Sequence, residues 1–161
     1  MRILYDSKSN IHKRPFGCLK TDEKCEITLH IPSSVCTQRC FLCIENYEGF
    51  YMQIPMTKAD TVDMYEYFGV EFAINYAGLY HYWFLIEQKD NSFKLFKEGY
   101  SDTNIELGDK WQLTVYDKNY DTPSDFKGKV YYQIFPDRFY YEEILDSKDK
   151  LTPYKIHSSP N

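Results

Sequence analysis

The chain has 161 residues, a net charge of −5 and 43% hydrophobic residues. This length allows a core without disulfides or metals. The charge excludes the basic stripe of a nucleic-acid-binding protein, and apolar runs such as 79–86 are too short and polar to span a membrane. The start of the chain lacks a signal-peptide core, and five cysteines, an odd number, indicate reduced thiols. We therefore predict a cytoplasmic protein without nucleic-acid or membrane partners.

Hydrophobic alternation with period two predicts strands along most of the chain. In residues 26–31, Ile27, Leu29 and Ile31 share one face and polar side chains occupy the other. Further strands are predicted at 39–45, 50–56, 64–74, 79–87, 93–97 and 111–116, with hairpin turns at 46–49 and 75–78. About seven or eight short strands at spacings near ten residues predict an all-β fold, an immunoglobulin-like antiparallel β-sandwich.

The pattern changes after residue 116. Thr122 as N-cap, followed by Pro123 and by Asp125 three residues after the cap, predicts one helical turn that acts as a linker. An apolar run at 130–135 follows and is closed by Pro136, Asp137 and Arg138. A barrel strand presents polar residues in this way at the active mouth. We predict a β-sandwich at 1–120, a linker at 121–129 and the truncated start of a barrel at 130–161.

The run Tyr-Gln-Ile-Phe-Pro-Asp-Arg-Phe at 132–139 resembles the first barrel strand of the α-amylase family, glycoside hydrolase family 13. The stretches 111–116, 121–123 and 128–139 together look like the junction between accessory domain and barrel in neopullulanase-like and α-amylase members, and 78–84 is similar to their aromatic N-terminal hairpin. The resemblance implies an orphan strand of a (β/α)8 barrel at the end of this chain. It makes Tyr132, Gln133 and Phe135 first-strand residues, and Asp137 and Arg138 structural or mouth-lining residues.

Family members cleave α-glucosidic bonds with retention, using an Asp nucleophile and a Glu acid/base on later barrel strands. The family's Gly-x-Arg-x-Asp, Asp-x-x-x-Asn-His and His-Asp motifs are absent from this sequence, so we predict no catalytic residue in the chain. The resemblance implies a non-catalytic N-terminal accessory domain that shapes the cleft, mediates homodimerisation or weakly binds glucan. Its partner would be an α-glucan, through the parent enzyme. The alternative is a free-standing carbohydrate-binding or scaffold module.

Four features of the sequence are candidate metal sites, and the surrounding residues argue against each of them. Cys36, Cys40 and Cys43 have the C-x3-C-x2-C spacing of an iron–sulfur site, but they fall in a strand-like run without a following glycine-rich motif. Residues 117–128 begin like an EF-hand but lack its Gly and Glu, and the four histidines show no ligand spacing. Residues 140–143 also lack the family's Asn-Gly-Asp type of calcium loop. We predict no metal and no cofactor.

Tyr80, Tyr82, Trp83 and Trp111 are the candidate glucan-contacting residues, because the apolar face of a sugar ring packs well on an aromatic ring. Strand alternation puts Tyr80 and Tyr82 on the face opposite Trp83. At most one of the two sets therefore faces water, and both could belong to the core.

Overall fold

The computed structural model describes residues 2–100 and 102–135. Its contact pattern divides the chain into two compact units, Met1–Asp121 and Thr122–Asn161. The first unit is built almost wholly of strands: β1 (Lys13–Arg14), β2 (Leu19–Lys20), β3 (Cys25–Pro32), β4 (Arg39–Asn46), β5 (Tyr51–Val62), β6 (Tyr65–Phe72), β7 (Gly78–Glu87), β8 (Ser92–Glu98), β9 (Asp102–Ile105) and β10 (Trp111–Tyr116). One 3-10 turn, η1 (Ser33–Val35), follows β3. The prediction of an all-β fold is confirmed.

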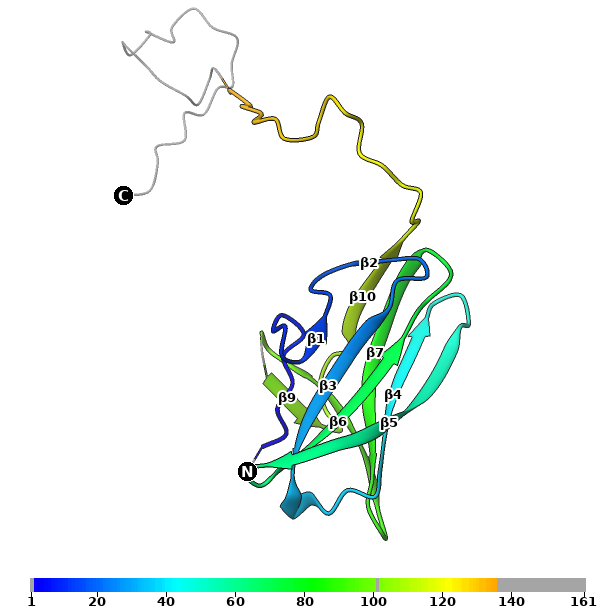
Figure 1. The fold of residues 1–161 in the computed structure, drawn as a ribbon, viewed down its shortest axis with the longest axis vertical. Coiled ribbons are helices and arrows are strands. Elements are labelled where there is room, and N and C mark those ends of the chain that lie inside the picture. The colour runs from blue at the N-terminus through cyan, green and yellow to red at the C-terminus, as the bar shows by residue number, and fades with distance from the viewer. Residues whose placement is uncertain (1, 101, 136–161) are drawn as a thin grey trace, which may run out of the picture. The chain divides into compact units, whose positions relative to one another are not determined.

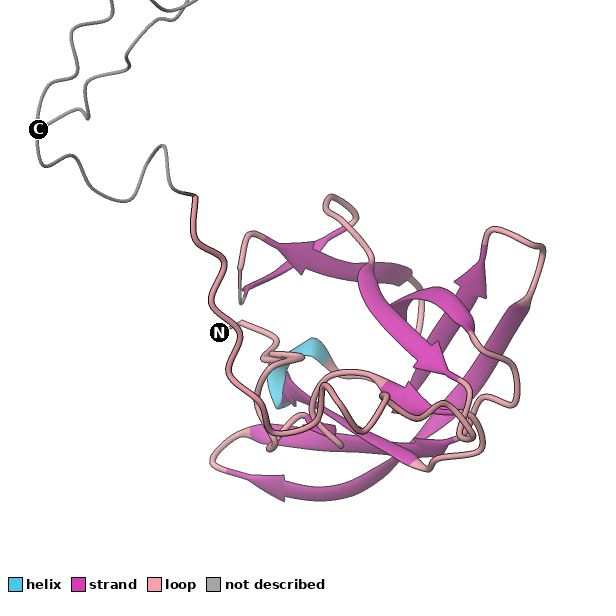
Figure 2. Cartoon of the chain, turned by 90° about the horizontal axis from the view of Figure 1, so that it is seen from above, coloured by secondary structure: helices cyan, strands magenta, loops and turns pink. Residues whose placement is uncertain are grey.

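The strands form one curled sheet with two layers, in which all pairs are antiparallel except the parallel pair of β10 and β2 (Figures 1 and 2). The strand order is β1-β3-β6-β5-β4-β7-β10-β2, with β8 and β9 added beside β7. The long strand β5 pairs with β4 over 51–56 and with β6 over 57–62, so it belongs to both layers. We call β1, β3, β6 and the second half of β5 the β3 layer, and the remaining strands the β7 layer.

The core lies between the two layers, where alternate side chains of both meet. Ile27, Leu29 and Ile31 are fully buried, as their alternation predicted. They belong to one hydrophobic cluster with residues of the β7 layer, among them Leu42, Ile44, Tyr82, Phe84 and Leu113. Apolar burial of this kind contributes roughly 25 cal/mol for each Å² removed from water. The strand faces predicted from the sequence therefore set the core of the first unit.

Several elements differ from the predictions. The strands β1, β2 and β9 were not predicted, and β5 extends six residues beyond the predicted end at Met56. The predicted helical turn at 122–129 is a hydrogen-bonded turn, in which the Phe126 N–H donates to the Pro123 carbonyl at 2.9 Å. Residues 130–135 have no regular secondary structure in this chain, although a strand was predicted there. Their place in a barrel, like the predicted domain bounds, stays a prediction.

The N-terminal segment, residues 2–12, closes the core of the first unit. The N–H of Leu4 donates to the His30 carbonyl at 2.9 Å, and that of His30 donates back to Leu4 at 3.2 Å. The Tyr5 ring is 2% exposed, and its hydroxyl lies 2.9 Å from the hydroxyl of Tyr82. Tyr5 also makes edge-to-face contacts with Phe84 and Trp111, at centroid distances of 4.8 and 5.0 Å. The segment is thus part of the core, which its short apolar runs did not predict.

His30 is a buried imidazole whose protonation should destabilise the fold. It is 9% exposed, its ring lies 4.5 Å from that of His12 and 4.0 Å from that of Tyr67, and its Nε2 has no hydrogen-bond partner. Burial, and secondarily His12, lower the pKa of His30 from 6.5 to about 4. The unfolded chain therefore binds this proton first as the pH falls. The contribution of His30 to stability is complete above pH 6.5 and is lost between 6.5 and about 4.

We expect this lost contribution to reach at most about 3 kcal/mol. The measurement is urea unfolding of the native chain and of His30→Asn at several pH values across that window. Because carboxylates titrate in the same range, the informative quantity is the difference between the two pH profiles. The profile of His30→Asn should be flatter than that of the native chain. Parallel profiles for the native chain and His30→Asn would contradict this prediction.

Candidate functional site

Three of the four predicted glucan-contacting side chains lie in the core. Tyr80, Tyr82 and Trp111 are each at least 97% buried. The rings of Tyr82 and Trp111 stack at a centroid distance of 5.7 Å, and the Tyr80 hydroxyl donates to the Tyr76 carbonyl at 3.0 Å. None of the three offers a ring face to a ligand. The physical reason is the alternation along β7 and β10, which turns these positions toward the β3 layer.

Trp83 lies on the opposite face of β7, as the alternation predicted, yet it is only 7% exposed. The ammonium of Lys110 lies 4.4 Å from its ring centroid, a cation–π contact. Lys110 in turn forms an ion pair with Glu45, on the neighbouring strand β4. The Tyr51 ring on β5 is 6.2 Å from Trp83 and tilted by 38°. A lysine and a tyrosine therefore cover the single predicted aromatic residue on this face.

This face of the β7 layer also carries exposed rings. Tyr47 is 86% exposed and makes an edge contact with His81 at 5.1 Å, and Tyr51 is 57% exposed. The Tyr51 hydroxyl donates to Gln53 Oε1 at 3.0 Å and lies 3.8 Å from the Cys43 sulfur. We call the set Cys43, Glu45, Tyr47, Tyr51, Gln53, His81, Trp83 and Lys110 the outer face.

The sequence contained the signal for Tyr51. Phe50, Met52 and Ile54 were predicted to share one side of a strand, which turns Tyr51 and Gln53 to the other side. Lys110 had no such signal, because it lies between β9 and β10, outside any alternating pattern.

The backbone beside β8 fixes the position of Lys110. The N–H of Asp109 donates to the Lys97 carbonyl at 3.1 Å, and the Lys97 N–H donates to the Asp109 carbonyl at 2.8 Å. Gly108 precedes this pair with φ +144°, and a Cβ there would lie 2.5 Å from the Lys97 oxygen. Lys110 is therefore held between β8 and the first residue of β10, directly before Trp111.

The cysteines of the C-x3-C-x2-C pattern do not converge. Cys40 lies in the core and Cys43 on the outer face, because residues three apart on a strand point to opposite sides. Cys36 is exposed in the turn after η1. Burial raises the pKa of the Cys43 thiol, which keeps it protonated and a poor metal ligand at neutral pH. Within residues 2–100 and 102–135, no three His, Cys, Asp or Glu side chains gather in a metal-binding group.

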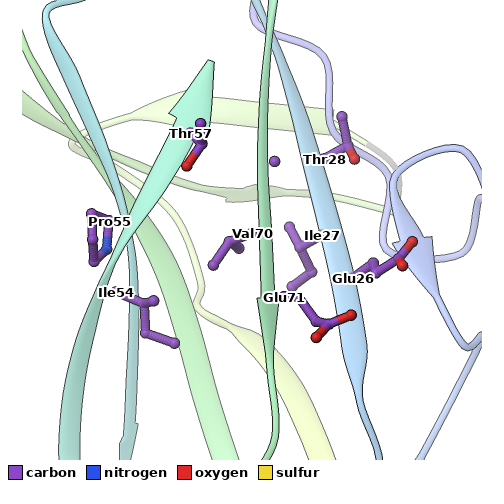
Figure 3. Close-up of a pocket in the computed structure, with 9 residues that line it drawn as sticks. Glu26, Ile27, Thr28, Ile54, Pro55, Thr57, Val70 and Glu71 are labelled. Carbon is purple, nitrogen blue, oxygen red and sulfur yellow. The ribbon is translucent and has the colours of Figure 1, made fainter. Parts of the chain in front are cut away.

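One hollow in the first unit opens where β5 leaves β6 (Figure 3). It encloses about 420 Å³ between β3, β5 and β6, and Ile27, Ile54 and Val70 line its apolar part. Glu26 and Glu71 lie at its polar side, where Glu71 pairs with Lys24 at 2.7 Å. No aromatic ring lines this hollow. A second hollow of about 280 Å³ lies beside the N-terminal segment, between Tyr5, His12 and Asp102.

Comparison with known proteins finds amylopullulanases among the proteins that this chain is similar to. It is 28% identical to the amylopullulanase of Thermoanaerobacterium thermosulfurigenes, over 99% of this chain and 9% of that protein. The amylopullulanase of Thermoanaerobacter thermohydrosulfuricus is also 28% identical, over 98% of this chain and 11% of its own length. The resemblance to an N-terminal domain of glycoside hydrolase family 13 is confirmed. The chain spans about a tenth of the length of these curated relatives.

A solved structure shows the same fold. A cyclomaltodextrinase aligns with 70% of this chain and 19% of its own, with a TM-score of 0.52 and 11% sequence identity. At that identity the likeness shows the fold of this chain alone. No family model matches the chain.

Of the five residues predicted to begin the barrel, three lie within the part of the chain that the structure describes. Tyr132, Gln133 and Phe135 lie in the stretch without regular structure. Asp137 and Arg138 lie outside the described residues. The strand and mouth roles of all five therefore stay predictions, as do the cytoplasmic location and the homodimer. In the part of the chain that the structure describes, no helix is long and apolar enough to cross a membrane.

Proposed function

We propose that this chain is the non-catalytic N-terminal accessory domain of an α-glucan-hydrolysing enzyme of the starch, maltodextrin or pullulan class. The single observation that carries the proposal is the sequence similarity to amylopullulanases, which covers 99% of the chain. The parent enzyme would cleave with retention, through two carboxylates of its barrel. Those carboxylates would be supplied from outside this chain, so the domain acts by shaping the cleft, by dimerisation or by weak glucan binding.

Weak glucan binding is the accessory role that the outer face favours. Exposed tyrosine rings beside amide, imidazole and carboxylate groups provide both stacking surfaces and hydrogen-bond partners for sugar hydroxyls. The alternative, a free-standing carbohydrate-binding or scaffold module, would use the same face. The two differ in whether the native gene encodes the family's barrel motifs beyond residue 161.

The test of the accessory role is a deletion in the native full-length protein. We expect removal of residues 1–121 to lower kcat/KM on amylopectin or pullulan by about tenfold, with a smaller effect on a short maltoside. The short substrate is the internal control, because it does not reach beyond the catalytic cleft. Equal losses on both substrates would indicate a folding defect of the barrel rather than a lost accessory function. An open reading frame without barrel motifs would contradict the proposal and favour the free-standing module.

A further inference from the structure

We infer that the outer face binds an α-glucan chain on the rings of Tyr47, Tyr51 and Trp83, with Lys110 as a cover that the sugar displaces from Trp83. This inference rests on the proposed function for the class of ligand. It goes beyond that function by assigning the binding face and a residue that controls access to it.

The Tyr51 and Trp83 rings lie next to each other on the outer face. Tyr51 and Trp83 come from β5 and β7, the two neighbours of β4, so their rings lie across the strands at 6.2 Å. Tyr47 makes an edge contact with His81, which precedes Trp83 by two residues on the same face of β7. The exposed faces of Tyr47 and Tyr51 are large apolar surfaces that a sugar ring can cover. The indole of Trp83 would add the widest ring of the three.

The Lys110 side chain covers the Trp83 ring. The Lys110 ammonium lies above the indole and pairs with Glu45, and both side chains are about one third exposed. Cation–π contacts and ion pairs at such exposure contribute little free energy. The long lysine side chain can therefore swing aside at small cost, whereas its backbone is fixed by the Asp109–Lys97 pair. Of the two side chains that cover Trp83, Lys110 is thus the one that a ligand can displace at small cost.

The charge of Lys110 determines which class of polymer this face can accept. The cation over the indole is neutralised by Glu45, which suits an uncharged polymer better than an anionic one. The Cys43 thiol beneath Tyr51 is also held neutral, because burial raises its pKa. Gln53 and His81 supply neutral hydrogen-bonding groups at the border of the rings.

The experiment is a fluorescence and calorimetric titration of the 161-residue chain with maltoheptaose, with cellohexaose as the linkage control. We expect millimolar binding of maltoheptaose with a change in indole fluorescence, which Trp83→Phe abolishes because Trp111 is in the core. Lys110→Ala should bind about threefold to tenfold more tightly. Lys110→Arg, which keeps a cation over the ring, should bind more weakly than Lys110→Ala.

Further variants locate the ligand. Tyr51→Ala should weaken binding about threefold to tenfold. Tyr100→Ala, which removes a more exposed ring from the turn after β8, should bind as the native chain does. Circular dichroism and thermal unfolding of each variant exclude misfolding.

Two results would overturn the inference. If maltoheptaose binds but the Tyr51 and Lys110 variants bind as the native chain does, the outer face is not the site, and the proposed accessory function stands. If neither the native chain nor Lys110→Ala binds at millimolar maltoheptaose, the domain has no glucan site on this face. The deletion test on the full-length enzyme then decides separately whether the domain has an accessory role.

Discussion

Tyr5→Ala is expected to lower the free energy of unfolding of the first unit by about 3–5 kcal/mol. The Tyr5 ring is 98% buried and contacts three aromatic side chains of the β7 layer, Tyr82, Phe84 and Trp111. Removing it leaves a cavity that rigid neighbouring rings cannot fill. It also removes the hydroxyl partner of Tyr82, whose own hydroxyl is buried.

Two further variants separate the causes of this loss. Tyr5→Phe keeps the ring and should cost about 1 kcal/mol, because only the hydrogen bond between the two tyrosine hydroxyls is lost. Tyr100→Ala, at a ring that is 79% exposed, should cost less than 1 kcal/mol. The measurement is equilibrium unfolding in urea, followed by circular dichroism and by indole fluorescence. A loss below 1 kcal/mol for Tyr5→Ala would mean that the N-terminal segment is not part of the core.

Strand positions with one buried face could be predicted from the sequence, because burial imposes a period of two. β10 begins and ends where predicted, β3 is one residue longer at both ends, and β4 and β7 are each one residue longer at one end. The second half of β5 could not be predicted, since all six residues from Thr57 to Val62 are exposed and carry no apolar period. The backbone of this second half of β5 is irregular. A bulge lies between Lys58 and Asp60, and the Asp60 side chain accepts the Thr61 N–H.

Elements held by distant contacts were also beyond prediction. β1 and β2 have two residues each, too few to show any period. Lys13 is buried there because its ammonium donates to the carbonyls of Pro15 and Gly17, at 2.9 and 2.7 Å. Hydrogen bonds from a buried lysine to nearby carbonyls cannot be recognised in a hydropathy pattern. The same holds for Tyr5, whose partner Tyr82 is 77 residues away.

The candidate site shows the same division between local and distant information. The alternation of β7 correctly separated Trp83 from Tyr80 and Tyr82, because it is a local property of the strand. The cover over Trp83 depends on Lys110 meeting Glu45, which lies 65 residues away. A sequence pattern can therefore name the ring on the outer face, but it cannot say whether that ring is open to a ligand.

Gly108→Ala should lower the free energy of unfolding by about 2–4 kcal/mol and should also uncover Trp83. The backbone at Gly108 has φ +144°, and the added Cβ would lie 2.5 Å from the Lys97 oxygen and 3.1 Å from the Phe96 Cβ. Lys97 cannot move away freely, because it pairs with Thr103 of β9 and with Asp109. The strain is therefore expected to displace the 108–110 backbone, and Lys110 with it.

The matched control is Gly99→Ala. Gly99 also has a positive φ, +56°, but a Cβ there meets no atom within 4 Å. It should cost about 1 kcal/mol from backbone strain alone and leave the indole emission unchanged. Gly108→Ala should in addition shift the emission to longer wavelength, as Trp83 gains water contact, and Trp83→Phe in the same background should remove that shift. Equal losses of stability for the two alanine variants would show that the close approach to Lys97 does not hold Lys110 in place.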